Sequence, residues 1–305
     1  MTWRTLTADG EKHAAYADDE WLRSGLAAAR EVLGDDVARV VQRHAVLVLQ
    51  PDCVAGRVAH RCVDLVRRNG FEPVHTVRFH FGPELTAGIW HYQSTISTPA
   101  SLAIADHVCG KSDSLLVLLR DTTPHPVIPA SLRLSDLKGR STPAKRTARH
   151  LRTVLGAPTV LVVLVHTPDE PIDVVRESTV LLGPDVRDLF ARMAAPAPTD
   201  AADVLAGRID ALHAEVDPHD LDLAAASRRL GDLVPDAMRR GDAKLDWGRF
   251  TADLVRAGVD PTGWDALLVG SAHVEHDRPG VPRLVDRVSV ESWLAGEGVL
   301  LPPFR

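Results

Sequence analysis

The chain has 305 residues, which is long enough for two domains or for one domain with large extensions. Its net charge of −6 argues against a general nucleic-acid-binding protein. Its three cysteines form no CxxC pair, so neither a disulfide framework nor a cysteine zinc site is indicated. No apolar run approaches the ~20 residues that span a membrane. The polar N-terminus lacks a signal-peptide hydrophobic region, so we expect a cytoplasmic protein with no membrane partner.

Short apolar runs and amphipathic stretches alternate over the first two thirds of the chain. The apolar runs predict strands at 44–49, 71–81, 114–119 and 160–165. The amphipathic stretches predict helices at 19–33, 57–69, 84–92, 101–108 and partly at 144–155, with a loop-rich segment at 121–143. Helical crossovers beside antiparallel neighbours are typical of a ferredoxin-like α/β (α+β) sandwich with a mainly antiparallel four-stranded sheet.

The pattern becomes mostly helical after residue 199. Helices are predicted at about 200–215, 220–240, 245–257 and 288–295. We therefore expect a helical N-terminal extension at 1–42, with 1–18 loosely held, an α/β domain at 43–193, a linker at 194–199 and a small all-α domain at 200–305.

The stretch from 156 to 183 carries the main candidate for chemistry. A buried-type strand ends at His166, and the following residues have helix-start chemistry, with an oxygen side chain to cap and prolines in the first turn. Glu170, Asp173 and Glu177 lie on that helix, within reach of the imidazole. A strand-end histidine oriented by a carboxylate is a workable nucleophile or base. The alternative is an ordinary histidine at a strand–helix junction.

Charge is distributed unevenly along the chain. Residues 200–305 carry 19 acids and 12 Lys or Arg, a net −7, so the preceding residues carry +1. Between Arg133 and Arg152, seven cations stand against one acid, Asp136. Such a stretch is either a solvated face or a binding site for a polyphosphate. We expect the acidic C-terminal part to pack beside the nucleotide pocket; the alternatives are an independently folded appendage and an oligomerisation element.

Several motifs, in order, resemble those of the nucleoside diphosphate kinase family over about residues 43–193. The family's Lys-Pro-Asp, His-Tyr, Gly-x-Thr-Asn-Pro and His-Gly-Ser-Asp motifs are matched by Gln50-Pro51-Asp52, His91-Tyr92, Gly139-Arg140-Ser141-Thr142-Pro143 and His166-Thr167-Pro168-Asp169. Arg152 matches an arginine nine residues after the loop proline, and Glu177 matches a glutamate eleven residues after the histidine. The order and spacing of these motifs carry the resemblance, because no single motif is decisive.

The resemblance implies that His166 is phosphorylated and dephosphorylated in a ping-pong cycle, with Glu177 orienting the imidazole. It implies ATP or another nucleoside triphosphate with Mg²⁺ as cofactors, and a nucleotide and a small-molecule acceptor as partners; it leaves a homo-oligomer open. The implied nucleotide and phosphate site consists of Gln50, Tyr92, Arg133, Ser141, Arg152 and Asp169. No metal-ligating residues are predicted, because His273, Glu275 and His276 match no strong zinc signature.

The departures from the family pattern bear on activity. Gln50 stands where the family has lysine, Val163 where it has asparagine, and Pro168 where it has serine. A second phosphate-binding arginine would fall near Ser135, and Arg133 is two residues away. Each lost donor to the phosphoryl group can be worth ~10²–10³ in rate. We therefore expect a phosphotransferase that acts on a specialised acceptor. The alternatives are an impaired module that binds nucleotide for regulation or scaffolding, and an enzyme of another group transfer.

Overall fold

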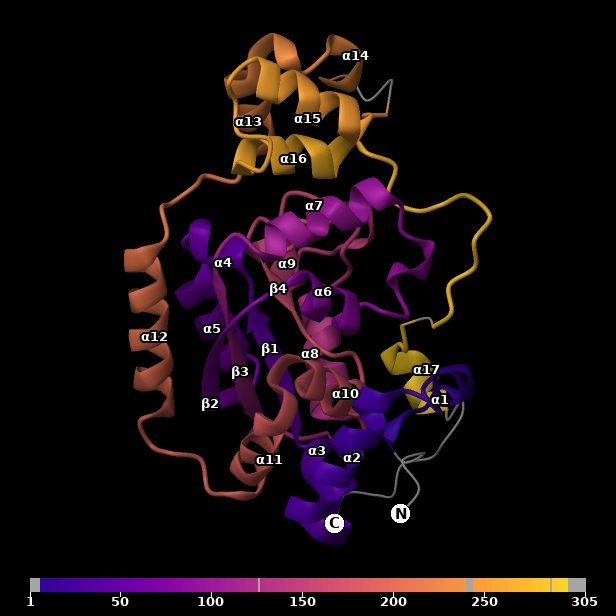
Figure 1. Ribbon diagram of the computed structural model, residues 1–305. Coiled ribbons are helices and arrows are strands. Elements are labelled where there is room, and N and C mark those ends of the chain that lie inside the picture. Colours follow the sequence, from indigo (N-terminus) through magenta and orange to yellow (C-terminus); the bar gives the residue numbers. More distant parts are fainter. Residues whose placement is uncertain (1–5, 126, 240–243, 286, 296–305) are drawn as a thin grey trace.

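A four-stranded antiparallel sheet forms the centre of the protein (Figure 1). The computed structural model describes residues 6–125, 127–239, 244–285 and 287–295. The strands are β1 (His44–Leu49), β2 (Phe71–His80), β3 (Asp113–Asp121) and β4 (Val165–His166), in the spatial order β2-β3-β1-β4. Every neighbouring pair is antiparallel. This order, with helical crossovers, confirms the predicted ferredoxin-like sandwich.

Helices surround the sheet and continue beyond it. Within the described residues they are α1 (Gly10–Ala15), α2 (Glu20–Leu33), α3 (Val37–Val41), α4 (Pro51–Ala55), α5 (Ala59–Arg68), α6 (Pro83–Ile89), α7 (Pro99–Cys109), α8 (Ala130–Lys138), α9 (Leu151–Val154), α10 (Pro171–Leu182), α11 (Val186–Ala194), α12 (Ala201–Glu215), α13 (Leu223–Leu230), α14 (Asp236–Arg239), α15 (Trp247–Arg256), α16 (Trp264–His273) and α17 (Val290–Ala295). None of the helices in the described ranges has the length and apolar character needed to cross a bilayer.

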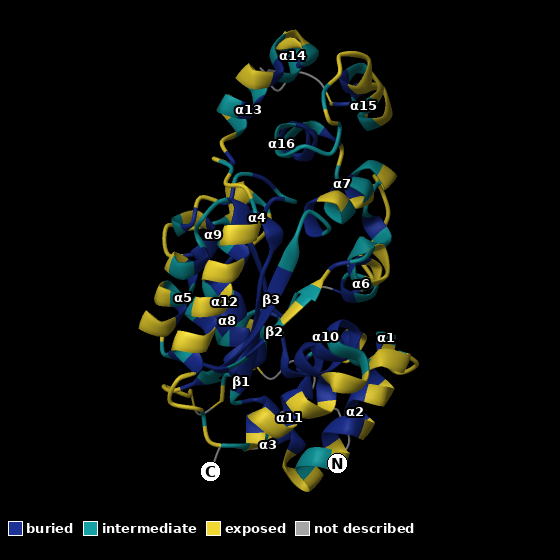
Figure 2. Cartoon of the chain, turned by 60° about the vertical axis from the view of Figure 1, so that its left-hand side comes forward, coloured by how far each residue is buried: buried dark blue, intermediate teal, exposed yellow. Residues whose placement is uncertain are grey.

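Both faces of the sheet are buried, as the unbroken apolar run of β1 requires. Leu47 and Leu49 pack on the face covered by α5, α8 and α12. Val46 and Val48 alternate with them and pack on the opposite face, under α2, α3, α10 and α11. Figure 2 shows the buried parts of the sheet in dark blue between helices whose outer sides are exposed, whereas the end of β2 is teal and yellow. The site described below lies on the α10 face.

The strand predicted at 160–165 is wrong except at its last residue. Leu164 has a positive φ of 69°, and its N–H donates to the Asp52 carboxylate at 2.7 Å. Val165 N donates to Val163 O, and Val162 N to Thr159 Oγ1, so this apolar segment turns repeatedly instead of extending. Apolar runs of this length do not separate a strand from a buried irregular segment.

Four helices that follow β1, namely α4, α8, α11 and α16, lie where the sequence pattern did not predict them. α8 occupies the segment predicted as loop, with Ala130 and Leu134 in the core. α16 is buried from Ala266 to Ser271, so its sequence has no polar stripe to mark it as a surface helix. Of the helix predicted at 144–155, only α9 is present. The preceding residues form turns, and Arg146 donates a hydrogen bond to Arg140 O in this segment.

The helical C-terminal part has two environments. α13, α15 and α16 form a cluster that packs on α7, at the top of Figure 1. α12, predicted to belong with them, instead lies beside β2 and α5, with Leu205, Ile209 and Leu212 in the sheet's core. The predicted division into domains stays a prediction. Residues 1–5 of the extension and 296–305 of the all-α part lie outside the described residues.

Candidate active site

His166 lies at the end of β4, where the sheet register sets its direction. It pairs with Val48 of β1, whose side chain packs on the α10 face. Because directly opposite residues on paired strands point to the same face, the imidazole points toward α10. Its ring meets Trp90 edge-on, with 5.4 Å between ring centroids, and the residue is 9% exposed. The strand end thus places His166 between the sheet and the helix.

Glu177 provides a carboxylate for this histidine. Glu177 Oε2 lies 2.6 Å from His166 Nε2, and both side chains are buried. α10 is buried from Pro171 to Leu181, so packing along its length holds the glutamate in place. The carboxylate favours the tautomer in which Nε2 carries the hydrogen. Within the described residues Nδ1 makes no hydrogen bond, so its lone pair is left for chemistry.

Charged side chains hold the loop that follows His166. Lys138 Nζ donates to Thr167 O at 2.8 Å and lies 3.2 Å from Asp169 Oδ1. Asp169 also accepts a hydrogen bond from Ser135 Oγ. Burial lowers the pKa of Lys138 to about 8, although Asp169 opposes this shift. Burial raises the pKa of Asp169, but Lys138 and Arg287 together hold it well below its usual range. Asp169 therefore binds the cations of the site, contrary to its predicted phosphate role.

Arg287 lies where the resemblance expects a second arginine. It donates to Ser135 O at 2.5 Å and to Ser135 Oγ at 2.9 Å, and its Nε lies 3.6 Å from Asp169. The sequence pattern gives no signal for this residue, because it lies 152 positions from Ser135 along the chain. Lys138 does have a signal, since it follows Ser135 by three positions on one helix.

Arg133 is wrong as a phosphate-binding residue. It pairs with Asp121, donates to Thr123 O at 2.9 Å and lies over the Phe71 ring at 5.2 Å. Phe71 and Asp121 face each other at one end of the sheet, whereas His166 pairs near the other end of β1. Arg133 therefore stabilises the far end of the sheet.

Arg152 lies beside β4, where both of its terminal nitrogens bind backbone carbonyls. Its Nη1 donates to Gly139 O at 3.0 Å and its Nη2 to Val165 O at 2.8 Å. Its Nε is buried and has no hydrogen-bond partner. Burial, with Arg146 nearby, lowers the pKa of Arg152 to about 9. The guanidinium ties the loop at Gly139 to the residue before His166 with two of its five N–H donors, and its Nε has no partner.

The basic stretch is largely an internal framework. Arg146 donates to the carbonyls of Ser141, Ala157 and Thr159, and Arg149 pairs with Asp136. Ser141 itself is exposed, and its contribution is the carbonyl that Arg146 binds. Five of the seven cations therefore have protein partners, namely Arg133, Lys138, Arg146, Arg149 and Arg152.

Gln50, in place of the family's lysine, is sealed at the end of β1. It is 2% exposed, its Nε2 lies 3.6 Å from Cys109 Sγ, and its Oε1 is buried without a partner. Asp52 is fully buried and accepts from Leu164 N, and burial raises the pKa of its carboxyl to about 6. Asp52 thus holds the turn before β4.

Tyr92 contacts the N-terminal segment rather than an open pocket. Its hydroxyl donates to Asp19 Oδ2 at 3.0 Å, and its ring lies 4.5 Å from that of Tyr16 and 5.0 Å from Arg176 Cζ. Burial and Asp19 raise the pKa of Tyr92 to about 12. A nucleotide base would have to displace this segment to stack on Tyr92, so the predicted stacking role does not fit this arrangement.

The N-terminal segment is firmly packed, so the expectation that it is loosely held is wrong. Lys12 is 2% exposed and lies 2.7 Å from Glu170 Oε2 and 2.8 Å from Asp173 Oδ2. Tyr16 OH donates to Asp173 Oδ1 at 2.8 Å, and Ala8 N donates to Glu170 at 2.9 Å. Glu170 and Asp173 therefore bind α1 and do not contact His166, which leaves Glu177 as its carboxylate partner.

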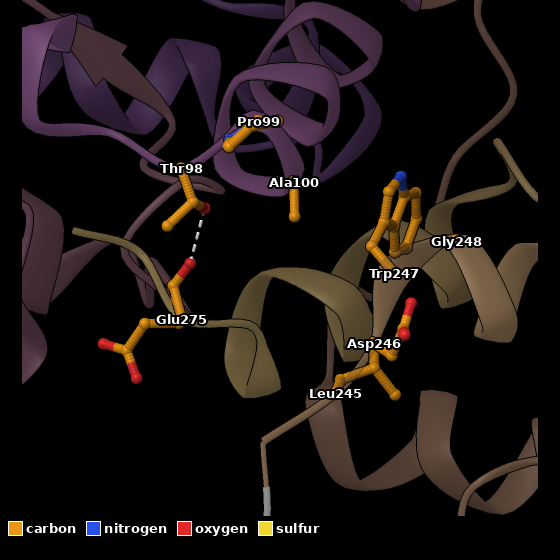
Figure 3. A pocket seen from close by; sticks show the side chains of 8 residues that line it. All are labelled: Thr98, Pro99, Ala100, Leu245, Asp246, Trp247, Gly248 and Glu275. Atoms are coloured by element: carbon orange, nitrogen blue, oxygen red, sulfur yellow. Dashed lines mark hydrogen bonds between the residues drawn. The ribbon is translucent and has the colours of Figure 1, made fainter. Parts of the chain in front are cut away.

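A separate pocket of about 420 Å³ lies between α7 and the helical cluster (Figure 3). Trp247, Leu245 and Ala100 are among the apolar residues that line it, and Thr98 Oγ1 donates to Glu275 O at 2.6 Å on one side. None of the site residues predicted from sequence lines it. We therefore place the candidate chemistry at His166.

Comparisons with known proteins find only distant structural similarity. No protein-family model and no curated protein matches the chain. Among solved structures it is similar to a nucleoside diphosphate kinase of Aquifex aeolicus, at 14% identity and TM-score 0.38, covering 45% of this chain and 93% of that one. The nucleoside diphosphate kinase of Encephalitozoon cuniculi is 13% identical with a TM-score of 0.40, and the match covers 53% of this chain and 99% of that one. The kinase of Pyrobaculum aerophilum is 15% identical with a TM-score of 0.36, and the match covers 45% of this chain and 94% of that one. These similarities assign no family.

Proposed function

We propose that the protein is a nucleotide-dependent phosphotransferase that works through a phosphohistidine at His166 and serves a specialised acceptor. The observation that carries this proposal is the 2.6 Å contact between His166 Nε2 and Glu177 Oε2, while no residue in the described part of the chain hydrogen-bonds to Nδ1. A buried carboxylate on one ring nitrogen raises the nucleophilicity of the other and stabilises the positive charge that forms on the ring.

The proposed reaction has two balanced steps. Nδ1 attacks the terminal phosphorus of a nucleoside triphosphate, the bond to the bridging oxygen breaks, and the nucleoside diphosphate leaves. An anionic oxygen of the acceptor then attacks the phosphorus of the phosphohistidine, the nitrogen–phosphorus bond breaks, and its electron pair returns to Nδ1. Glu177 keeps its hydrogen bond to Nε2 in both steps.

Polar atoms beside His166 fit a phosphate ligand. Arg152 Nε and Thr167 Oγ1 are buried without hydrogen-bond partners, and such atoms are uncommon in folded proteins. Lys138 and Arg287 supply two cations to the same loop. The His166 side chain is 11% exposed, so a ligand would enter by displacing part of the surrounding cover. The N-terminal segment, which covers Tyr92, is our candidate for that movement.

The residues of the site do not form a magnesium site of their own. Asp169 is engaged by Lys138 and Ser135, and Glu177 by His166, so neither carboxylate is left for a hard cation. Mg²⁺ would therefore come to the site on the phosphates of the nucleotide, where it supplies charge neutralisation. A homo-oligomer and a cytoplasmic location stay predictions.

The second candidate is a module that binds a nucleotide without phosphorylating itself. It is favoured by Gln50, which provides no charge where the family has lysine, and by Arg152, whose two terminal nitrogens bind backbone carbonyls. Both features remove donors from the developing phosphoryl charge.

Labelling with γ-³²P ATP separates the two candidates. We expect acid-labile, base-stable label on the wild type and on His107→Ala, which changes an exposed histidine, and none on His166→Ala. Glu177→Gln should slow labelling by ~10²–10⁴. Nucleotide binding by calorimetry without label on any variant would support the binding module. Neither binding nor label would overturn both.

A further inference from the structure

Three potential metal ligands meet on the opposite side of the sheet from His166, between α5 and α12. They are His60, Asp210 and His213, and one ligand atom from each lies within 4.8 Å of the other two. His60 Nε2 is 2.7 Å from Asp210 Oδ1, and the two imidazole centroids are 5.6 Å apart. His213 Nε2 is buried and has no hydrogen-bond partner, so one nitrogen of the cluster is unsatisfied.

Helix geometry explains why these residues converge. Asp210 and His213 are three positions apart on α12, so they occupy one face. Ile209 and Leu212, immediately before each of them, pack into the core and set the rotation of the helix. α5 lies beside α12 in Figure 1, and His60 is near its start. The packing of two helices, and not a local motif, creates the cluster.

We propose that His60, Asp210 and His213 bind one zinc ion, with water completing the coordination. Two imidazole nitrogens and one carboxylate oxygen match the donors that zinc takes, whereas magnesium and calcium prefer oxygen alone. A tetrahedral ion with ligands at ~2.0–2.2 Å can be reached from this spacing by side-chain rotation. Binding would satisfy the buried His213 nitrogen.

The zinc ion would join α12 to the sheet layer. α12 precedes the helical cluster of α13, α15 and α16 in the chain, so a metal between α12 and α5 would anchor the segment that leads to it. Because the ion binds the folded arrangement, zinc should stabilise the protein; at about 100 times Kd the Tm should rise by roughly 5 °C.

The test uses full-length protein that has been stripped with a chelator. Titration with Co²⁺, read by its visible absorption, should show one equivalent that Zn²⁺ displaces. His60→Gln and His213→Gln should each weaken binding by at least ~10-fold. His80→Gln is the matched control, because His80 also pairs with a surface carboxylate, at 3.0 Å from Asp113, but belongs to no three-ligand cluster among the described residues. It should bind like the wild type.

Two outcomes would overturn the proposal: wild-type affinity in His213→Gln, or equal weakening in all three histidine variants, which would indicate adventitious binding among the 14 histidines. Far-UV circular dichroism checks that each variant is folded. If a histidine variant is not folded, Asp210→Asn takes its place, because this change is isosteric and its site is exposed. The Asp210→Asn protein should also lose the zinc-dependent rise in Tm.

Discussion

At the scale of single residues, burial determines the charge that a side chain carries. His44 begins β1 and is 3% exposed. Its Nδ1 lies 2.8 Å from Val40 O, which places the hydrogen there, and its Nε2 accepts from Arg120 at 3.4 Å. Burial, opposed by the bond to Val40 and helped by Arg120, lowers the pKa of His44 to about 4. The folded protein therefore holds this imidazole neutral.

We predict that His44 makes stability fall in mild acid. The unfolded chain takes up the proton below about pH 6.5, whereas the folded chain does so near pH 4, so the free energy of unfolding decreases as the pH falls through that window. The difference amounts to roughly 3 kcal/mol by pH 4, at about 1.4 kcal/mol per pKa unit. Urea denaturation from pH 7 to 4 measures it. His44→Gln should flatten this slope and the exposed His80→Gln should not; an equal slope in all three proteins would contradict the prediction.

At the scale of elements, the start of α10 links the candidate site to the N-terminus. Glu170 and Asp173 form a capping box, and Pro171 occupies the first turn. The same two carboxylates bind Lys12 of α1. Burial opposes the charge of Lys12, but Asp173 and Glu170 raise its pKa above the usual value. The first turn of α10 thus fixes the start of the helix that carries Glu177, and the same turn holds α1 in place.

We predict that Lys12→Met lowers the free energy of unfolding by ~3–5 kcal/mol at pH 7, because it leaves two buried carboxylates without their cation. Urea denaturation measures the loss. Lys145→Met is the control: Lys145 is exposed, so its replacement should change stability by less than ~0.5 kcal/mol. Equal stability of the two variants would show that the contact of α1 with α10 contributes little.

At the scale of the whole molecule, one apolar core connects the sheet to the helical cluster. Leu47 and Leu49 of β1 belong to the same buried cluster as Leu267 and Leu268 of α16. α16 meets α7 closely at Gly270, where an added Cβ would overlap the Trp247 ring and lie 3.1 Å from Ile104 Cδ1. The helical cluster therefore shares a continuous apolar core with the sheet.

We predict opposite effects for two glycine-to-alanine changes. Gly207→Ala, in the exposed middle of α12 with open space around the new methyl group, should stabilise the protein by ~0.5–1 kcal/mol. Gly270→Ala gains the same helix propensity, but overpacking of ~1–3 kcal/mol should make the net effect destabilising. Thermal unfolding followed by calorimetry compares them. A Gly270→Ala protein as stable as Gly207→Ala would contradict this prediction, because it would show that the side chains around Gly270 move aside at little cost in free energy.

Local patterns in the sequence were enough for β1 and for the start of α10, whereas the choice of Glu177 among the three carboxylates near His166 came from the family resemblance. β1 could be predicted because an apolar β-branched run has few alternatives, and α10 because its proline and capping residues act on their own neighbours. Because these interactions join residues that are close in the sequence, the sequence pattern alone predicts them.

The tertiary structure alone decided which charges meet. Arg287 reaches Ser135, Lys12 reaches Glu170 and His60 reaches Asp210 across 150 or more positions of chain. It also decided that Arg133 and Arg152 have internal partners, although their spacing suggested phosphate ligands. Charge in a sequence does not specify its partner, because the partner is selected only when packed helices and strands bring side chains within hydrogen-bond distance.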